Sequence, residues 1–179
     1  EDRPKRTYAS GEYFATNAIT DHALDFLDIA RKRKYPYLLY VGYQAAHFPV
    51  QAPIKLTESY VATYERGWDV LRAERLQRMK QLGLVDEKLT LPDRSPIDRP
   101  DIAKRIGSMT KDGINPAWDS LDKPRRADLA RRMAVYAAMV ENMDSNIGRL
   151  VQSLREHGEL ENTLLLFTSD NDACAEWDP

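Results

Sequence analysis

A long run of regularly spaced apolar residues in the second half of the chain constrains the fold more than any other feature. This spacing places the side chains on one face of an α-helix. It predicts a single helix of roughly 30 residues, about 45–50 Å long, which ends near Gly158. The apolar positions step by three or four along the chain and are Leu129, Met133, Tyr136, Val140, Met143, Ile147, Val151 and Leu154.

Two shorter runs are apolar on both faces and predict buried strands. The first covers residues 37–43 and follows a predicted helix that starts at a capping Thr16 or Thr20 and ends at about Lys34. The second covers residues 163–168 and follows the long helix. Strands of this kind are typical of a mainly parallel sheet covered by helices, so we expect an α/β layer fold.

The middle of the chain carries helical patterning and then loses it. A helix is expected from about Glu58, broken at Gly67, with a second piece that ends before Gly83. Residues 85–124 hold five prolines among many charges and show no periodicity, so we expect a surface excursion there. Two candidate strands are too few for a stable sheet, which usually holds about 4–6 strands. The chain therefore resembles the middle of a larger domain.

The composition excludes several classes of protein. The 179 residues include 26 Lys and Arg against 28 Asp and Glu, for a net charge of −2. No basic excess is present to bind nucleic acid. The single cysteine, Cys174, cannot form an intramolecular disulfide. The longest apolar run, residues 37–41, is far shorter than the roughly 20 residues that span a bilayer, so we expect no membrane partner.

Polar residues follow both predicted strands at their carboxyl ends, where ligands bind in open α/β sheets. His47 lies four residues beyond the first strand, and Asp170 and Asn171 come directly after the second. Taken singly, each is more often a loop or capping residue than a functional one. Carboxylate and amide oxygens suit calcium or magnesium, but calcium needs about 6–8 oxygens, so two ligands do not make a site.

Four segments of the chain, in this order, resemble type I sulfatases, specifically arylsulfatases. The similarity extends over nearly the whole chain from about Tyr8. The segments are residues 37–53 (YLLYVGYQAAHFPVQAP), 64–72 (YERGWDVLR), 133–149 in the predicted long helix, and 161–171 (ENTLLLFTSDN).

The resemblance implies a fold and a chemistry. It implies the alkaline-phosphatase superfamily, with a mixed central sheet flanked by helices, and a calcium-dependent sulfuric ester hydrolase acting on small-molecule or carbohydrate sulfate esters. Asp170 and Asn171 match the second pair of four calcium ligands, and His47 matches the histidine that contacts the sulfate ester. The resemblance also implies a formylglycine nucleophile, which the family makes from a cysteine in C-x-P/A-x-R. A periplasmic or secreted location also follows from the resemblance.

Departures from the family pattern limit what this chain can do alone. Cys174 is not followed by the required arginine, and nothing matches the first pair of calcium ligands. Asp172 replaces the usual glycine after Asn171, and Ala46 replaces the more frequent proline before His47. We therefore expect residues 1–179 to form a partial sulfatase catalytic domain, inactive by itself, without the N-terminal nucleophile and metal part and the C-terminal part. A phosphonate or phosphodiester hydrolase of the same superfamily and a non-catalytic, truncated binding module are the alternatives.

Overall fold

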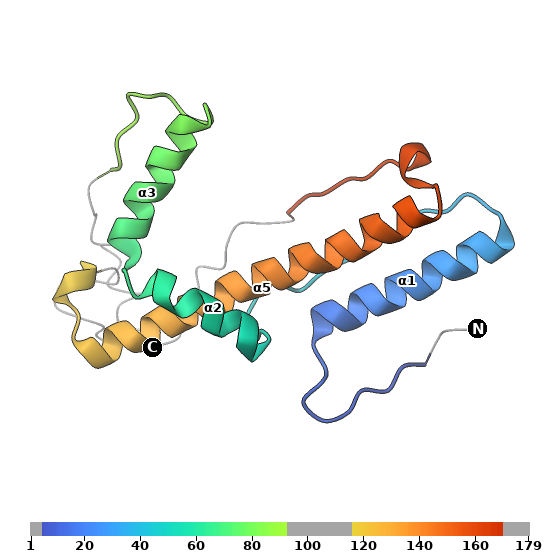
Figure 1. Ribbon diagram of the computed structural model, residues 1–179, viewed down its shortest axis with the longest axis horizontal. Helices are drawn as coiled ribbons and strands as arrows, with labels where there is room; N and C mark the ends of the chain where they lie inside the picture. The colour runs from blue at the N-terminus through green and yellow to red at the C-terminus, as the bar shows by residue number, and fades with distance from the viewer. Residues whose placement is uncertain (1–4, 93–115, 170–179) are drawn as a thin grey trace, which may run out of the picture. The chain divides into compact units, whose positions relative to one another are not determined.

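The computed structural model describes residues 5–92 and 116–169, and its secondary structure is helical (Figure 1). The chain divides into two compact units, unit 1 (residues 1–57 and 135–174) and unit 2 (residues 58–134 and 175–179). None of the described helices is both long enough and apolar enough to cross a membrane. The described elements are α1 (Ala15–Arg33), α2 (Ile54–Tyr64), α3 (Trp68–Gln81), η1 (Trp118–Ser120), α5 (Lys123–Glu156) and η2 (Leu160–Asn162).

The long helix predicted from the apolar spacing is confirmed as α5, which has 34 residues. Asp122 caps its start, because the Asp122 carboxylate accepts a hydrogen bond from the Arg125 backbone N–H at 2.7 Å. Gly158 ends it with a positive φ of 69°. The backbone N–H of Glu159 then donates to the Leu154 carbonyl at 2.9 Å, which is the pattern of a Schellman cap.

The buried face of α5 differs from the expected one. Tyr136 and Val140, two members of the predicted apolar face, are exposed. Three alanines that step by four residues, Ala130, Ala134 and Ala138, are instead completely buried. Small side chains let neighbouring parts of the chain come close to the helix backbone, so the alanine row packs where larger residues were expected. The apolar period correctly predicted the helix and part of its buried face, since Leu129 and Leu154 are buried, but it did not predict the alanine row.

The predicted α/β fold with a mixed central sheet is wrong for the described residues, which contain helices and no strand or sheet. Residues 37–43 and 163–168 are extended, but their backbones make no strand ladder within the described chain. A strand exists only through hydrogen bonds to a neighbouring strand, and apolar content alone does not supply one. Leu38 is accordingly 97% exposed and Leu166 86% exposed.

The core of unit 2 is built around Trp118. Its ring meets that of Trp68 edge-on, with centroids 4.9 Å apart and an interplanar angle of 76°. The indole N–H of Trp68 donates to the Pro116 carbonyl at 3.1 Å, and the Asp69 carboxylate accepts the Trp118 backbone N–H at 2.8 Å. Trp68 and Asp69, which are neighbours in the sequence, therefore hold residues 116–118 in place. The other residues of this core are Tyr64, Leu121, Leu129, Ala130 and Met133.

Helix α1 ends at Arg33, as expected from the sequence, but it starts differently. Phe14 occupies its N-cap position and makes no side-chain capping bond, so neither Thr16 nor Thr20 is the cap. Thr20 lies inside the helix and is completely buried. Lys34 closes the helix in the left-handed region at a φ of 56°, with its backbone N–H donating to the Ala30 carbonyl at 3.1 Å.

Candidate functional site

The candidate catalytic histidine, His47, lies in an exposed loop of unit 1. Its backbone N–H donates to the Gln44 carbonyl at 2.8 Å and closes a turn. Its ring Nδ1 lies 2.7 Å from the Phe48 carbonyl oxygen. A carbonyl can only accept, so Nδ1 carries the proton in this contact. The loop therefore fixes the tautomer of the ring and leaves Nε2 as the nitrogen whose protonation can change. The Ala45–Ala46 and Phe48–Pro49 peptide bonds are cis.

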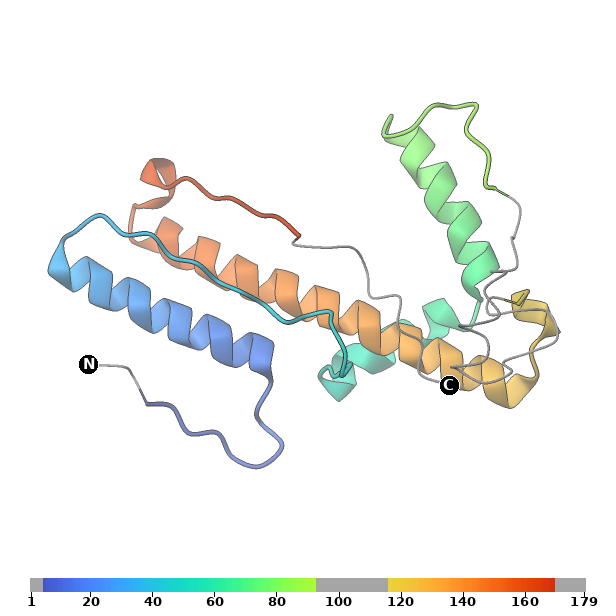
Figure 2. The ribbon, with the colours of Figure 1, turned by 180° about the vertical axis from the view of Figure 1, so that it is seen from behind.

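The extended segment before His47 runs back along α1. Near the end of α1, the Tyr37 hydroxyl donates to the Glu159 carboxylate at 3.5 Å. Nearer the start of α1, the Tyr43 hydroxyl lies 2.7 Å from the Thr20 hydroxyl oxygen. Six extended steps from residue 37 to 43 cover about 20 Å, and the eleven helical steps from residue 31 to 20 cover about 16 Å. The segment thus spans the helix and brings Tyr43, four residues before His47, close to the start of α1. Figure 2 shows the segment running along α1.

A charged cluster joins the ends of α1 and α5. Arg31 donates to the Glu159 carboxylate through Nη2 at 2.8 Å and Nε at 3.0 Å, and to Asp28 at 2.8 Å. The hydrogen bonds from Arg31 lower the pKa of Glu159. Partial burial opposes the charge of Arg31, but its bonds to Glu159 and Asp28 outweigh that effect and raise the pKa of Arg31. Burial and the nearby Glu159 charge raise the pKa of Tyr37.

The second extended segment, residues 163–169, starts from the same cluster. The Thr163 hydroxyl donates to the Glu159 backbone carbonyl at 2.8 Å, and the Glu159 carboxylate accepts from the Tyr37 hydroxyl. From there residues 163–169 run back along the unit 1 part of α5, in the same direction as residues 37–43 run along α1 (Figures 1 and 2). The carboxyl ends of both segments therefore point toward one end of unit 1. Asp170 and Asn171, the predicted metal ligands, lie outside the described residues.

A network of side-chain amides holds α1 against α5. The Asn17 side-chain oxygen accepts hydrogen bonds from Asn142 at 3.0 Å and from Asn146 at 2.9 Å. Arg149 extends the network by donating to Asn146 at 2.9 Å and to Asp21 at 2.6 Å. Asn146 is only 3% exposed. The partner of Asn17 on α5 precedes the partner of Asp21, so residue numbers increase in the same direction along both helices. The helices therefore run parallel, and these hydrogen bonds fix their register.

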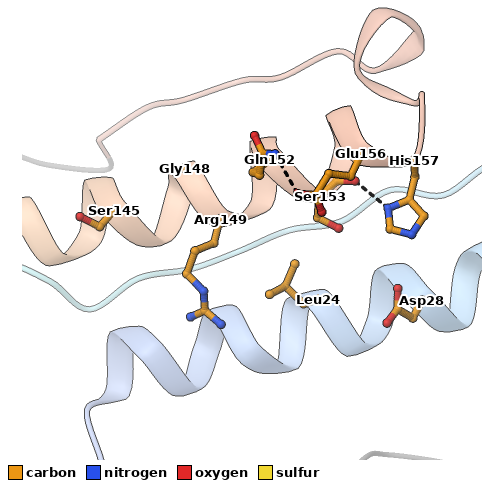
Figure 3. Close-up of a pocket in the computed structure, with 9 residues that line it drawn as sticks. All are labelled: Leu24, Asp28, Ser145, Gly148, Arg149, Gln152, Ser153, Glu156 and His157. Carbon is orange, nitrogen blue, oxygen red and sulfur yellow. Dashed lines mark hydrogen bonds between the residues drawn. The ribbon is translucent and has the colours of Figure 1, made fainter.

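A shallow groove of about 590 Å³ lies between α1 and α5 in unit 1 (Figure 3). The charged groups on its walls and the His157 ring already have partners within the protein. Asp28 pairs with Arg31 at 2.8 Å, Arg149 with Asp21 at 2.6 Å, and the His157 ring bonds to the Ser153 carbonyl at 2.8 Å. The groove therefore presents no unsatisfied charge that would recognise a ligand.

The candidate donors for a metal ion are identified from the sequence. In residues 5–92 and 116–169, no group of three or more His, Cys, Asp or Glu side chains could hold a metal ion. The carboxylate of Asp170 and the amide oxygen of Asn171 are hard donors of the kind that calcium prefers. Asp170 and Asn171 thus have the chemistry of calcium ligands, but they are two of the about 6–8 oxygen ligands that calcium takes.

Comparison with known proteins decides the family. The sulfatase family model matches residues 1–176. This chain belongs to the sulfatase family. The resemblance seen in the sequence is therefore confirmed at the level of the family.

Three relatives of this sulfatase-family chain are informative. An uncharacterized sulfatase of Schizosaccharomyces pombe is 37% identical over 90% of this chain, and the arylsulfatase of Klebsiella aerogenes is 30% identical over 80% of it. The N-acetylglucosamine-6-O-sulfatase of Bacteroides thetaiotaomicron is 28% identical over 88% of the chain. The matches cover 26%, 27% and 33% of these relatives, so the chain spans about a quarter to a third of their length.

The sequence indicates His47 as a candidate catalytic residue but not the residues that hold its segment in place. The sequence pattern indicates Thr20 only as a possible helix cap, and Tyr43 only as the last residue of a predicted strand. The sequence signal for the contact between these two residues is weak. Tyr43 ends an apolar run four residues before His47, and Thr20 is a polar residue at an apolar position of a helix. The contact between residues 23 positions apart becomes visible only in the fold.

Proposed function

We propose that the full-length sulfatase-family protein carrying this chain is an arylsulfatase-like hydrolase of sulfate esters. The match of the family model to residues 1–176 is the observation that carries this proposal. Relatives whose names specify an arylsulfatase and an N-acetylglucosamine-6-O-sulfatase support aryl or carbohydrate sulfate esters as the substrate class.

In this proposal His47 acts on the leaving oxygen of the ester. Its Nδ1 proton is held by the Phe48 carbonyl at 2.7 Å, so a second proton can reside only on Nε2. A protonated Nε2 can hydrogen-bond to the bridging ester oxygen and donate its proton as the bond to sulfur breaks, which is general acid catalysis. The leaving group then departs as a neutral alcohol or phenol.

Asp170 and Asn171 would hold a calcium ion together with ligands from outside this chain. A bound calcium ion would offset the negative charge of the sulfate oxygens. The proposed nucleophile is a formylglycine, also outside this chain, so we expect residues 1–179 alone to be inactive.

The test uses the full-length protein with His47→Gln, and compares 4-nitrophenyl sulfate with an alkyl or sugar sulfate whose leaving group is poorer. We expect kcat to fall by about 10²- to 10⁴-fold, with the larger loss for the poorer leaving group because it depends more on the donated proton. His157→Gln is the matched control, since His157 lies at the end of α5 and its ring is bonded to Ser153.

Equal losses for both leaving groups would contradict the acid role of His47. Absence of sulfate ester hydrolysis by the wild-type protein, or faster hydrolysis of an aryl phosphodiester, would contradict the proposed activity. Turnover by the isolated 179-residue chain would contradict the expectation that the nucleophile lies outside it.

A further inference from the structure

The hydroxyl groups of Thr20 and Tyr43 form a partly buried contact that connects the His47 segment to α1. Their oxygens are 2.7 Å apart, and Thr20 is 0% exposed. The Thr20 hydroxyl also lies 3.1 Å from the Thr16 carbonyl oxygen, one helical turn earlier. Thr20 thus bonds both to its own helix and to a residue 23 positions away.

The number of protons fixes the direction of this contact. A threonine hydroxyl has one proton, and the Thr16 carbonyl can only accept, so Thr20 donates its proton to Thr16. Tyr43 must therefore be the donor to the Thr20 oxygen. The chain Tyr43 to Thr20 to Thr16 satisfies both hydroxyls, and the tyrosine proton points into α1.

This contact is important because the extended segment has few other attachments. Among the described residues, no backbone hydrogen bond holds positions 35–43 to a neighbouring segment. The two tyrosine hydroxyls attach the segment instead, Tyr37 to Glu159 at its start and Tyr43 to Thr20 at its end. Only the second attachment is close to His47, which follows Tyr43 after a turn closed by the Gln44 carbonyl.

The helix that receives this contact is itself held in place. Thr20 lies between Asn17, which accepts two hydrogen bonds from α5, and Asp21, which pairs with Arg149 of α5. A displacement of Tyr43 relative to Thr20 would therefore be a displacement of the loop relative to the paired helices α1 and α5.

We propose that Tyr43 is a positioning residue for His47, acting through its hydrogen bond to Thr20. This inference rests on the proposed function, because His47 is the residue that needs to be positioned. Tyr43 contributes no atom to the reaction in this scheme. It sets the place and orientation of the histidine relative to the helices, and a small misplacement of a catalytic group can lower a rate by about 100-fold.

The test compares four variants of the full-length protein. Tyr43→Phe removes only the donor, and Thr20→Val removes the acceptor with little change of shape. Thr20→Ser retains the hydroxyl and should restore the contact. Tyr37→Phe is the matched control, because it removes the same hydroxyl from the opposite end of the same segment.

The first readout is hydrogen–deuterium exchange of a peptide covering residues 44–50, followed by mass spectrometry. We expect exchange about five- to tenfold faster in Tyr43→Phe and Thr20→Val, because one hydrogen bond no longer opposes local opening. Peptides from α1 should be unchanged, which separates a local loss of position from unfolding. Thr20→Ser and Tyr37→Phe should match the wild type at 44–50. Unchanged exchange in Tyr43→Phe would overturn the proposal.

The second readout is the division of the effect between kcat and KM for 4-nitrophenyl sulfate. We expect Tyr43→Phe to lower kcat by about 10- to 100-fold with KM within about twofold, and Thr20→Ser to retain the wild-type kcat. An unchanged kcat in an active enzyme would overturn the proposal. If the wild-type protein hydrolyses no sulfate ester, the proposed function fails, and the exchange experiment still decides whether Tyr43 holds the loop.

Discussion

Different kinds of contact stabilise the interior of each of the two units. Unit 2 is centred on the Trp118 ring, which packs against Trp68 and leaves no room for a side chain at Gly67. Unit 1 pairs α1 with α5 through an amide network at Asn146 and a charged cluster at Glu159.

The difference indicates what each unit responds to. A core defined by aromatic shape is sensitive to added volume, because packed interiors tolerate little overpacking. A helix pair defined by hydrogen bonds and ion pairs is sensitive to unsatisfied donors and to pH. Unit 2 should therefore be destabilised most by added side-chain volume. Unit 1 should be destabilised most by the loss of a hydrogen-bond partner or by a change of pH.

The largest effect is expected from Gly67→Ala. Gly67 has φ 86° and ψ 154°, a region that essentially only glycine adopts. An added Cβ would lie 2.3 Å from Cγ of Trp118. Backbone strain and overpacking together should lower the free energy of unfolding of unit 2 by roughly 3–5 kcal/mol. The measurement is chemical denaturation followed by the circular dichroism couplet of the edge-on Trp68 and Trp118 rings.

Gly83→Ala is the matched control for this prediction. Gly83 also has a positive φ, of 68°, but a Cβ there would have nothing within 4 Å. It should cost only about 1–2 kcal/mol, the penalty of the left-handed backbone. Equal losses for the two variants would mean that the Trp118 contact does not determine the shape of unit 2.

Local patterns predicted the helices of this molecule well. The apolar spacing before Gly83 predicted α3, and that before Gly158 predicted α5. Both glycines follow their helix and have a positive φ. Both signals act within a few residues of one another, so the sequence contains them completely. The predicted sheet failed because a strand depends on a distant partner. Residues 37–43 have the apolar composition of a strand but no neighbouring strand among the described residues.

The candidate site was predictable only in part for the same reason. His47 is a candidate because it follows a recognisable apolar run, within a segment that resembles sulfatases, and its catalytic role stays a prediction. Thr20 could not be linked to it, because a buried threonine in a helix has no local signature of its long-range partner. The Gly67, Trp68 and Asp69 motif was recognisable as a family feature, whereas its contact with Trp118 required the fold.

The second prediction concerns the amide network of unit 1. Asn146→Ala removes a donor to Asn17 and an acceptor for Arg149, both at a position that is almost completely buried. The free energy of unfolding of unit 1 should fall by about 1–3 kcal/mol. Hydrogen exchange of α1 peptides measures this loss locally.

Two further variants sharpen this prediction. Asn162→Ala changes the same side chain at an exposed position and should stay within about 0.5 kcal/mol of the wild type. The double variant Asn17→Ala with Asn146→Ala should show a coupling energy of about 0.5–3 kcal/mol. Strictly additive losses would indicate that burial, and not the hydrogen bond between the two amides, holds the helices in register.

The smallest effect, and the one most specific to unit 1, is a change in pH dependence on Glu159→Gln. The hydrogen bonds from Arg31 lower the pKa of Glu159 in the folded state. A lowered pKa contributes stability above the ordinary pKa of glutamate, and that contribution is lost as the pH falls through the lowered value. The variant should therefore lose stability at neutral pH and show a shallower decline in acid.

Some acid dependence should remain in this variant, because a hydrogen bond from Arg6 also lowers the pKa of Asp25 on α1. Glu58→Gln is the control, since its ion pair with Arg131 lies in unit 2 and both side chains are about half exposed. Such a pair contributes only about 0–1 kcal/mol, and its loss should leave the acid unfolding of unit 1 unchanged. The two variants are distinguished by measuring hydrogen exchange in α1 peptides as a function of pH. If Glu159→Gln declined in acid as steeply as the wild type, the charged cluster would not be what makes unit 1 sensitive to pH.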